Sequence, residues 1–302
     1  MKNTSVILNE FRRKLFKSCY GEDCIKKCHP RARRAIGSIM ILLVALAFTA
    51  CGGDSGNNAN SDEPVSSSSV KSSSSSAKSS SSVTVATSCK TEKKDNCEYG
   101  SLTDDRDGQT YKTVKIGEQI WMAENLNYEE RNSYCYNDSA EYCAKYGRLY
   151  TWAAAMDSAE SWSSNGRYCG FNKTCSSKNP VRGICPKGWH LPSDQEFKTL
   201  FEAVGGKSTA GTALKSTSGW HNEGSGTDAF GFSALPVGDR ETSGRRDADV
   251  VFNNEGNGTY FWSSAEFDKI NAHGLCLKDY HGDAYLDLVR KSYSFSVRCI
   301  QD

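Results

Sequence analysis

The sequence lacks an excess of charge of either sign, because 37 Lys and Arg residues are balanced by 36 Asp and Glu residues, for a formal net charge of +1. The folded part also lacks a dense Lys/Arg stripe, so we exclude nucleic acid as a partner. Hydrophobic residues make up only 37% of the 302 residues. A serine-rich segment explains much of this shortfall, and the usable core lies in the C-terminal two-thirds of the chain.

Near the N-terminus, an apolar run from Ile39 to Ala50 is too short to cross a bilayer as an ordinary helix. Basic residues precede this run and small residues end it, which is typical of a signal peptide. The segment Leu46–Cys51 resembles the lipobox of bacterial lipoproteins, although Phe48 replaces the usual Leu. We therefore expect a signal peptide and leader over residues 1–50 and a lipidated Cys51. An ordinary signal peptide, cleaved without lipidation, is the alternative.

The next segment is rich first in Gly, Asn and Asp and then in Ser, up to Ser88. Such a composition cannot bury enough apolar surface to offset the entropy lost on ordering. We expect residues 51–88 to contain the lipid anchor and a disordered linker, which tethers a folded domain over residues 89–302. A passive spacer is an equally open interpretation of the linker.

The first clear elements of the folded domain are two strand-like segments, Tyr111–Ile116 and Gln119–Met122, on either side of Gly117-Glu118. Glycine as the first of two loop residues is typical of a type II′ turn. The sequence therefore predicts a β-hairpin.

An acidic turn precedes this hairpin, with Asp104, Asp105 and Asp107 followed by Gly108. Carboxylates at this spacing can bind calcium, but the downstream Glu of a calcium loop is absent. We favour a solvated turn, and we expect neither a metal ion nor a cofactor.

Two segments have the spacing of amphipathic helices. The first begins with a capping box at Ser193 and Glu196 and ends at Gly205-Gly206. Its apolar face consists of Phe197, Leu200, Phe201 and Val204. The second runs from Gly147 to Met156, with its large apolar side chains expected in the core.

After Gly205-Gly206 the pattern becomes irregular, and we expect a long loop from Gly211 to Asp249. Long irregular stretches in compact domains are usually functional or packed by their own aromatic side chains. We expect this loop to carry the ligand-binding face. The candidate ligand-binding residues are Trp220, His221, Asn222 and Arg240 in this loop, with Trp162 and Tyr168 as exposed aromatic residues in an earlier one. Aromatic rings can stack on sugar rings, although each Trp is more often a core residue.

The C-terminal part carries the clearest strand signal. Apolar and polar residues alternate strictly over Ser292–Ile300, and strand-like segments precede it at Tyr260–Ser264, Leu275–Leu277 and Ala284–Val289. The alternation places Tyr293, Phe295, Val297 and Cys299 on one face. The hairpin-like spacing predicts a terminal antiparallel sheet, and together with the two helices it predicts an α+β fold.

Nine Cys residues follow Cys51, and an exported protein can form disulfides. Three pairs are close in the sequence, namely Cys89/Cys97, Cys135/Cys143 and Cys169/Cys175. Cys185 and Cys299 would then form a long-range bridge, and Cys276 would remain as a small buried thiol. Eight cysteines allow many pairings, so this connectivity is a hypothesis.

Six motifs occur in a fixed order: Asp107–Tyr111 with Ile120–Leu126, Gly147–Trp152, Cys185–Ser193, Ala234–Gly238, Phe261–Ser264 and Ser296–Cys299. In this order they resemble the Fibrobacter succinogenes major paralogous domain, from about Asp104 to the C-terminus. The resemblance implies a fold similar to that of C-type lectins and a shared bridge between Cys185 and Cys299. It carries no mechanism, and it implies a role at the cell surface or in adhesion to fibres. The Glu-Pro-Asn, Gln-Pro-Asp and Trp-Asn-Asp triplets of calcium-dependent lectins are absent, so sugar binding through calcium is unsupported.

These features together predict a binding module that is displayed on the cell surface as an outer-membrane lipoprotein. Its expected ligand is plant cell-wall polysaccharide or another envelope component, and a structural or protein-interaction role is the alternative. We do not expect an enzyme and name no catalytic residue, because the acid–base candidates show no triad or metal-ligand spacing. Those candidates are His190, His221, His273, His281, Asp228, Asp239, Glu266, Asp279 and Asp283.

Overall fold

The computed structural model describes residues 84–242 and 250–302. All of them belong to the second of two compact units, Ser76–Asp302. The predicted signal peptide, the lipidation site Cys51 and most of the predicted linker lie outside the described residues. Within the described part, every helix is too short or too polar to span a lipid bilayer.

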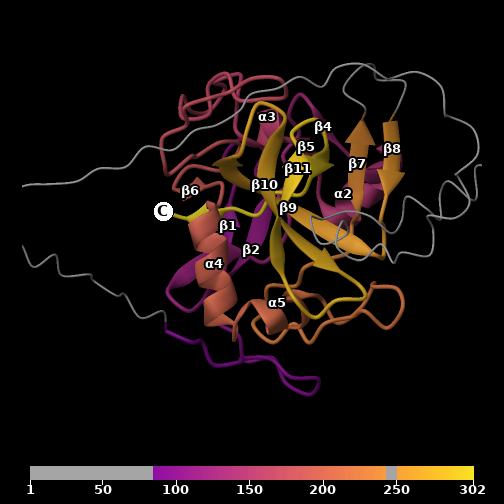
Figure 1. Ribbon diagram of the computed structural model, residues 1–302. Helices are drawn as coiled ribbons and strands as arrows, with labels where there is room; N and C mark the ends of the chain where they lie inside the picture. Colours follow the sequence, from indigo (N-terminus) through magenta and orange to yellow (C-terminus); the bar gives the residue numbers. More distant parts are fainter. Residues whose placement is uncertain (1–83, 243–249) are drawn as a thin grey trace, which may run out of the picture. The chain divides into compact units, whose positions relative to one another are not determined.

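One five-stranded sheet contains both the first and the last strand of the domain, in the order β1-β2-β3-β13-β6. Its strands are β1 (Tyr99–Thr103), β2 (Thr110–Ile116), β3 (Gln119–Met122), β6 (Trp189–His190) and β13 (Ile300–Gln301). The predicted hairpin is confirmed: Ile116 pairs with Gln119, and Gly117 adopts the positive φ of 60° that the turn requires. In Figure 1 the C-terminus lies beside β6, in agreement with this order.

The predicted helix after Pro192 is confirmed as α4 (Asp194–Ala203), with both hydrogen bonds of the capping box between Ser193 and Glu196 present. All four predicted apolar residues are buried in one core cluster. Phe197 stacks on Trp121 of β3, with ring centroids 5.5 Å apart. The helix thereby covers one face of the first sheet (Figure 1).

The expected loop from Gly211 to Asp249 is wrong at both ends, since its residues Asp239–Thr242 form a strand, β7. Its first residues are the end of a further helix, α5 (Lys207–Leu214). The following stretch is packed into the core by its aromatic residues, since Trp220, Phe230 and Phe232 are all buried. Residues 243–249 of the expected loop lie outside the described residues.

The helix predicted over Gly147–Met156 is also only partly present. Its first half is a strand, β5 (Leu149–Thr151), and only α3 (Trp152–Ala155) is helical. Tyr150 pairs with β4 (Ser133–Tyr134) on one side and β12 (Ser294–Phe295) on the other, and Leu149 pairs with β4, which holds their backbone extended despite the helical spacing of the side chains. Trp152 is buried as expected.

β5 belongs to a second five-stranded sheet, of order β4-β5-β12-β7-β8. Its other strands are β4 (Ser133–Tyr134), β7 (Asp239–Thr242), β8 (Val250–Asn253) and β12 (Ser294–Phe295). The 3-10 helix η3 (Tyr136–Asp138) and the helix α2 (Ala140–Tyr146) connect β4 to β5.

The predicted antiparallel sheet near the C-terminus is confirmed as a three-stranded sheet of order β11-β10-β9. Its strands are β9 (Gly258–Glu266), β10 (Asn271–Lys278) and β11 (Tyr285–Arg290). The single strand expected over Ser292–Ile300 is instead divided between β12 and β13. The reason is that its middle residues bond to several partners, because Val297 O accepts from Leu126 N and Ser296 O from Trp262 N. Phe295, Val297 and Cys299 nevertheless point into one core cluster, as the alternation predicted.

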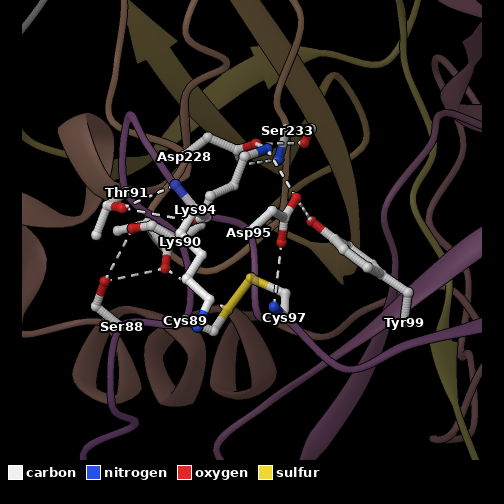
Figure 2. Close-up of a disulfide and its surroundings, with 11 residues drawn as sticks. Ser88, Cys89, Lys90, Thr91, Lys94, Asp95, Cys97, Tyr99, Asp228 and Ser233 are labelled. Atoms are coloured by element: carbon white, nitrogen blue, oxygen red, sulfur yellow. Dashed lines mark hydrogen bonds and ion pairs between the residues drawn. A yellow bond between two sulfur atoms is a disulfide. The ribbon is translucent and has the colours of Figure 1, made fainter.

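The four predicted disulfides are all present: Cys89–Cys97, Cys135–Cys143, Cys169–Cys175 and Cys185–Cys299. Cys276 is a buried free thiol. Figure 2 shows the first disulfide loop, in which Lys90 Nζ lies 2.5 Å from the buried carboxylate of Asp228. The described residues therefore form an antiparallel domain with four α-helices and four disulfides, of the α+β or mainly β class.

Candidate functional site

The six predicted ligand-binding residues do not form one site. Trp220 is only 7% exposed, and its indole N–H donates to Ser216 Oγ at 3.0 Å. Its ring therefore offers no open face for stacking on a sugar. His221 is exposed, and Asn222 donates to Asp279 Oδ2 at 2.6 Å.

Arg240 is buried and lies over the ring of Tyr134, with the guanidinium carbon 3.6 Å from the ring centroid. Tyr168 is 58% exposed, and Arg167 donates to its hydroxyl at 2.6 Å. Trp162 is half-buried. It contacts Tyr128 and Arg106, two residues that line a hollow.

That hollow has a volume of about 500 Å³. We call it the Tyr128 hollow, and it is lined by Arg106, Asp107, Gln109, Asn127, Tyr128, Glu129, Cys135, Ala140, Cys143 and Arg148. Its residues come from the turn between β1 and β2, the stretch after β3, the Cys135–Cys143 disulfide and the residue before β5.

Arg106 organises one wall of the Tyr128 hollow. Its Nε and Nη2 donate to the two carboxylate oxygens of Asp104, at 2.8 and 2.6 Å, and its Nη1 donates to Ile184 O at 2.8 Å. Burial would lower the pKa of Arg106, but Asp104 outweighs it and raises this pKa. Asp104 is completely buried, so the solvated turn expected here is wrong at this residue. Its carboxylate is committed to an ion pair.

The same guanidinium lies over two aromatic rings, 4.0 Å from the centroid of Tyr128 and 5.0 Å from that of Trp162. The two rings meet edge to face at 5.5 Å. Asp157 fixes the Trp162 loop, because its buried carboxylate accepts from the backbone N–H groups of residues 161, 162 and 163. Burial raises the pKa of Asp157 in spite of these three donors. The aromatic wall is therefore held in a defined position.

Other lining residues of the Tyr128 hollow are polar. Arg148 Nη2 lies 2.8 Å from Glu129 Oε2. Gln109 Nε2 donates to Asp107 Oδ2 at 2.6 Å. Among the described residues, no group donates to the buried Oδ1 of Asn127. An aromatic ring combined with amide and guanidinium groups is the kind of lining that orients a polar ligand with an apolar face.

A second hollow, of about 530 Å³, lies between α4 and the β10–β11 pair. We call it the His273 hollow, and it is lined by Asp194, Lys198, Phe201, Glu202, Lys207, His273 and Leu286. Asp194 contacts His273 Nδ1 through one oxygen and accepts from Ser263 Oγ through the other, at 2.7 Å. In a nucleophilic triad the His lies between the Ser and the carboxylate. Here Ser263 and His273 each contact a different oxygen of Asp194, so the three residues do not form a triad.

The nine acid–base candidates are dispersed, and only His273 lines either of these two hollows. Most have separate partners: His190 contacts Glu196, His281 contacts Asp283, Asp228 contacts Lys90, Asp239 contacts Asn254, Glu266 contacts Lys291 and Asp279 contacts Asn222. Burial raises the pKa of Asp239 to about 7, but this residue lines neither hollow. Among residues 84–242 and 250–302, no three His, Cys, Asp or Glu side chains are placed to hold a metal ion.

Sequence reasoning missed Arg106, Asn127, Tyr128 and Arg148. The spacing Asp104-x-Arg106 was one available signal, because an Asp and an Arg two residues apart in a turn can pair. The other three residues carry no local signal, since their role depends on segments that meet only in the fold.

The fold defines a disulfide-crosslinked antiparallel domain with a polar, aromatic-walled hollow. The chain belongs to the Fibrobacter succinogenes major domain family, whose model matches residues 114–301. Membership indicates a surface protein and does not specify what it binds. The match begins within β2, so the Cys89–Cys97 loop and β1 precede it. No curated protein and no solved structure matches the chain.

Proposed function

We propose that this protein is a cell-surface binding module that holds a carbohydrate, such as plant cell-wall polysaccharide, in the Tyr128 hollow. The observation that carries the proposal is the ring of Tyr128 in a hollow that also presents amide and guanidinium groups. Sugar rings combine an apolar face with many hydroxyls. An aromatic ring can pack against the apolar face, and amide and guanidinium groups can hydrogen-bond to the hydroxyls. We propose no enzymatic activity.

Binding of the full-length protein to cello- and xylo-oligosaccharides and to pectin fragments, measured by isothermal titration calorimetry, tests this function. Tyr128→Ala should weaken binding about fivefold or more, because an aromatic contact is worth roughly 1 kcal/mol. Tyr128→Phe keeps the ring and should bind like the wild type. Tyr280→Ala, at an exposed aromatic residue outside the hollow, should have no effect.

Unfolding curves of the same variants separate loss of the site from loss of the fold. If the wild type binds no glycan, the proposed function is wrong. If Tyr168→Ala weakens binding and Tyr128→Ala does not, the ligand binds at the exposed Tyr168 and not in the hollow.

We further propose export, lipidation on Cys51 and display on the outer membrane, with the serine-rich segment as a tether. The supporting features are the lipobox-like sequence and the composition of residues 51–88. Labelling with a radioactive fatty acid should mark the wild type and not Cys51→Ser, and protease added to intact cells should remove the domain. We also propose a C-type-lectin-like fold, supported by the terminal strand β13 and by the bridge from Cys299, the residue before this strand, to Cys185.

A second candidate function is contact with an envelope protein. It is favoured by exposed apolar side chains beside the His273 hollow. Phe267 is 59% exposed and stacks on His273 at 6.0 Å, and Leu288 is exposed opposite His273 on β11. Phe267→Ser together with Leu288→Ser should then abolish crosslinking to an envelope protein in cells and leave glycan binding unchanged. Unaltered crosslinking would contradict this second function.

A further inference from the structure

The two arginines of the Tyr128 hollow differ in their freedom to bind a ligand. Arg106 is saturated, because it is bound to the completely buried Asp104 and to a backbone carbonyl. Removing either partner would leave an uncompensated buried charge, which is strongly destabilising. Arg106 therefore shapes the hollow and contacts its aromatic rings, but its charge is already paired and is not available to a ligand.

Arg148 is different. Its side chain is only 14% exposed, yet its partner Glu129 is 81% exposed. Its other side-chain hydrogen bond within the described part of the chain is a long one, from Nη1 to Ser133 Oγ at 3.4 Å. Because Glu129 is solvated, it can turn into solvent when another carboxylate takes its place, so that the guanidinium stays paired throughout. Arg148 is thus a largely desolvated guanidinium with an exchangeable counterion.

A guanidinium binds carboxylates in a planar, two-point geometry. A ligand carboxylate can replace that of Glu129 without changing the charge balance of the hollow. Asn127 supplies a second requirement. Its buried Oδ1 accepts from none of the residues that the structure describes, and it needs an O–H or N–H donor. The ring of Tyr128 supplies a third, an apolar face.

A carboxylate, a hydroxyl donor and an apolar ring face occur together in a uronic acid. We propose that the Tyr128 hollow binds a uronic acid residue of an acidic polysaccharide, with the carboxylate on Arg148, a hydroxyl on Asn127 Oδ1 and the sugar ring against Tyr128. This inference rests on the proposed carbohydrate-binding function and narrows its ligand class.

The test compares two probes of equal length, hexagalacturonate and its fully methyl-esterified form, with the full-length protein in calorimetry at low salt. The ester keeps the sugar and removes the charge. We expect hexagalacturonate to bind at least tenfold more tightly. Arg148→Gln should abolish this preference, so that the variant binds both probes with the same weak affinity.

Glu129→Gln gives the sharper result, because a loss of folded protein cannot explain a gain in affinity. Removal of the competing carboxylate should tighten hexagalacturonate binding several-fold and increase the preference for this probe over the ester. Glu124→Gln removes another exposed carboxylate, outside the hollow, and is the matched control.

Equal affinity for the two probes would overturn the uronic acid assignment and leave carbohydrate binding intact. If neither probe binds and neutral cello- and xylo-oligosaccharides also fail, the proposed function itself is wrong. Displacement of hexagalacturonate by polyglutamate of equal charge, at equal concentration, would show a receptor for acidic peptides and would overturn the sugar class.

Discussion

His190 lies buried at the start of α4 between two carboxylates. Its Nε2 is 2.8 Å from Glu196 Oε1, and its Nδ1 is 2.8 Å from Asp302 Oδ1. Both ring nitrogens can donate only when the ring is protonated. Burial would lower the pKa of His190, but the two carboxylates outweigh it and raise this pKa above the ordinary 6.5. Burial would raise the pKa of Glu196, but His190 and Ser193 lower it below 4.5.

These two shifts predict a pH window for stability. The contribution of Glu196 is fully present above pH 4.5 and is lost as the pH falls through its lowered pKa. The contribution of His190 is fully present below pH 6.5 and is lost as the pH rises through its raised pKa. His190→Gln should therefore reduce the free energy of unfolding by about 1–3 kcal/mol at pH 5.5 and by less at pH 9.

Urea unfolding at both pH values measures this difference. His281→Gln, at an exposed residue 3.6 Å from Asp283, should change little at either pH. An equal loss for His190→Gln at pH 5.5 and pH 9 would show that packing, and not charge, accounts for the effect.

At the scale of elements, α5 shows how a glycine inside a helix can be required by its neighbour. Thr212 N donates to Gly282 O at 3.0 Å, and Ala284 N donates to Lys207 O at 3.0 Å. The helix thus lies directly on the turn between β10 and β11 (Figure 1). A Cβ at Gly211 would come within 2.1 Å of Asp283 O.

Gly→Ala in an exposed helix usually stabilises by about 0.5–1 kcal/mol. Gly211→Ala should do the opposite and destabilise by roughly 1–3 kcal/mol, because backbone atoms of the turn would have to move. Ser208→Ala in the same helix is exposed and should be neutral or slightly stabilising. A higher melting temperature for Gly211→Ala would contradict this account of the contact.

At the scale of the whole domain, the bridges differ most in the length of chain they close. Cys185 and Cys299 are 114 residues apart, whereas Cys89 and Cys97 are 8 apart. A crosslink restricts the unfolded chain more when it closes a longer loop, by about 5 kcal/mol for the former and about 2.5 kcal/mol for the latter.

Replacing Cys185 and Cys299 by Ala should therefore cost roughly 2 kcal/mol more than replacing Cys89 and Cys97 by Ala. Denaturant unfolding of the two double variants under non-reducing conditions measures the difference. Equal losses would mean that native packing around the bridges, and not the restriction of the unfolded chain, governs their effect.

Much of this domain was predictable because some interactions are local. The capping box of α4 joins residues three apart, and the hairpin at Gly117 needs only two loop residues with suitable backbone freedom. The three short disulfides join cysteines six or eight residues apart. In each case neighbouring residues supply both partners, so the local pattern is sufficient.

The sequence alone thus determined the α4 helix, the first hairpin, the short disulfides and the apolar side of Phe295, Val297 and Cys299. Only the tertiary structure decided that Leu149 and Tyr150 are in a strand, that Trp220 is buried, and that Arg148 meets Tyr128 in one hollow. These outcomes depend on segments far apart in the chain, and burial and pairing between such segments can outweigh local spacing. The spacing of neighbouring residues therefore predicts a single helix or strand, whereas the binding site forms only where several such elements meet in the fold.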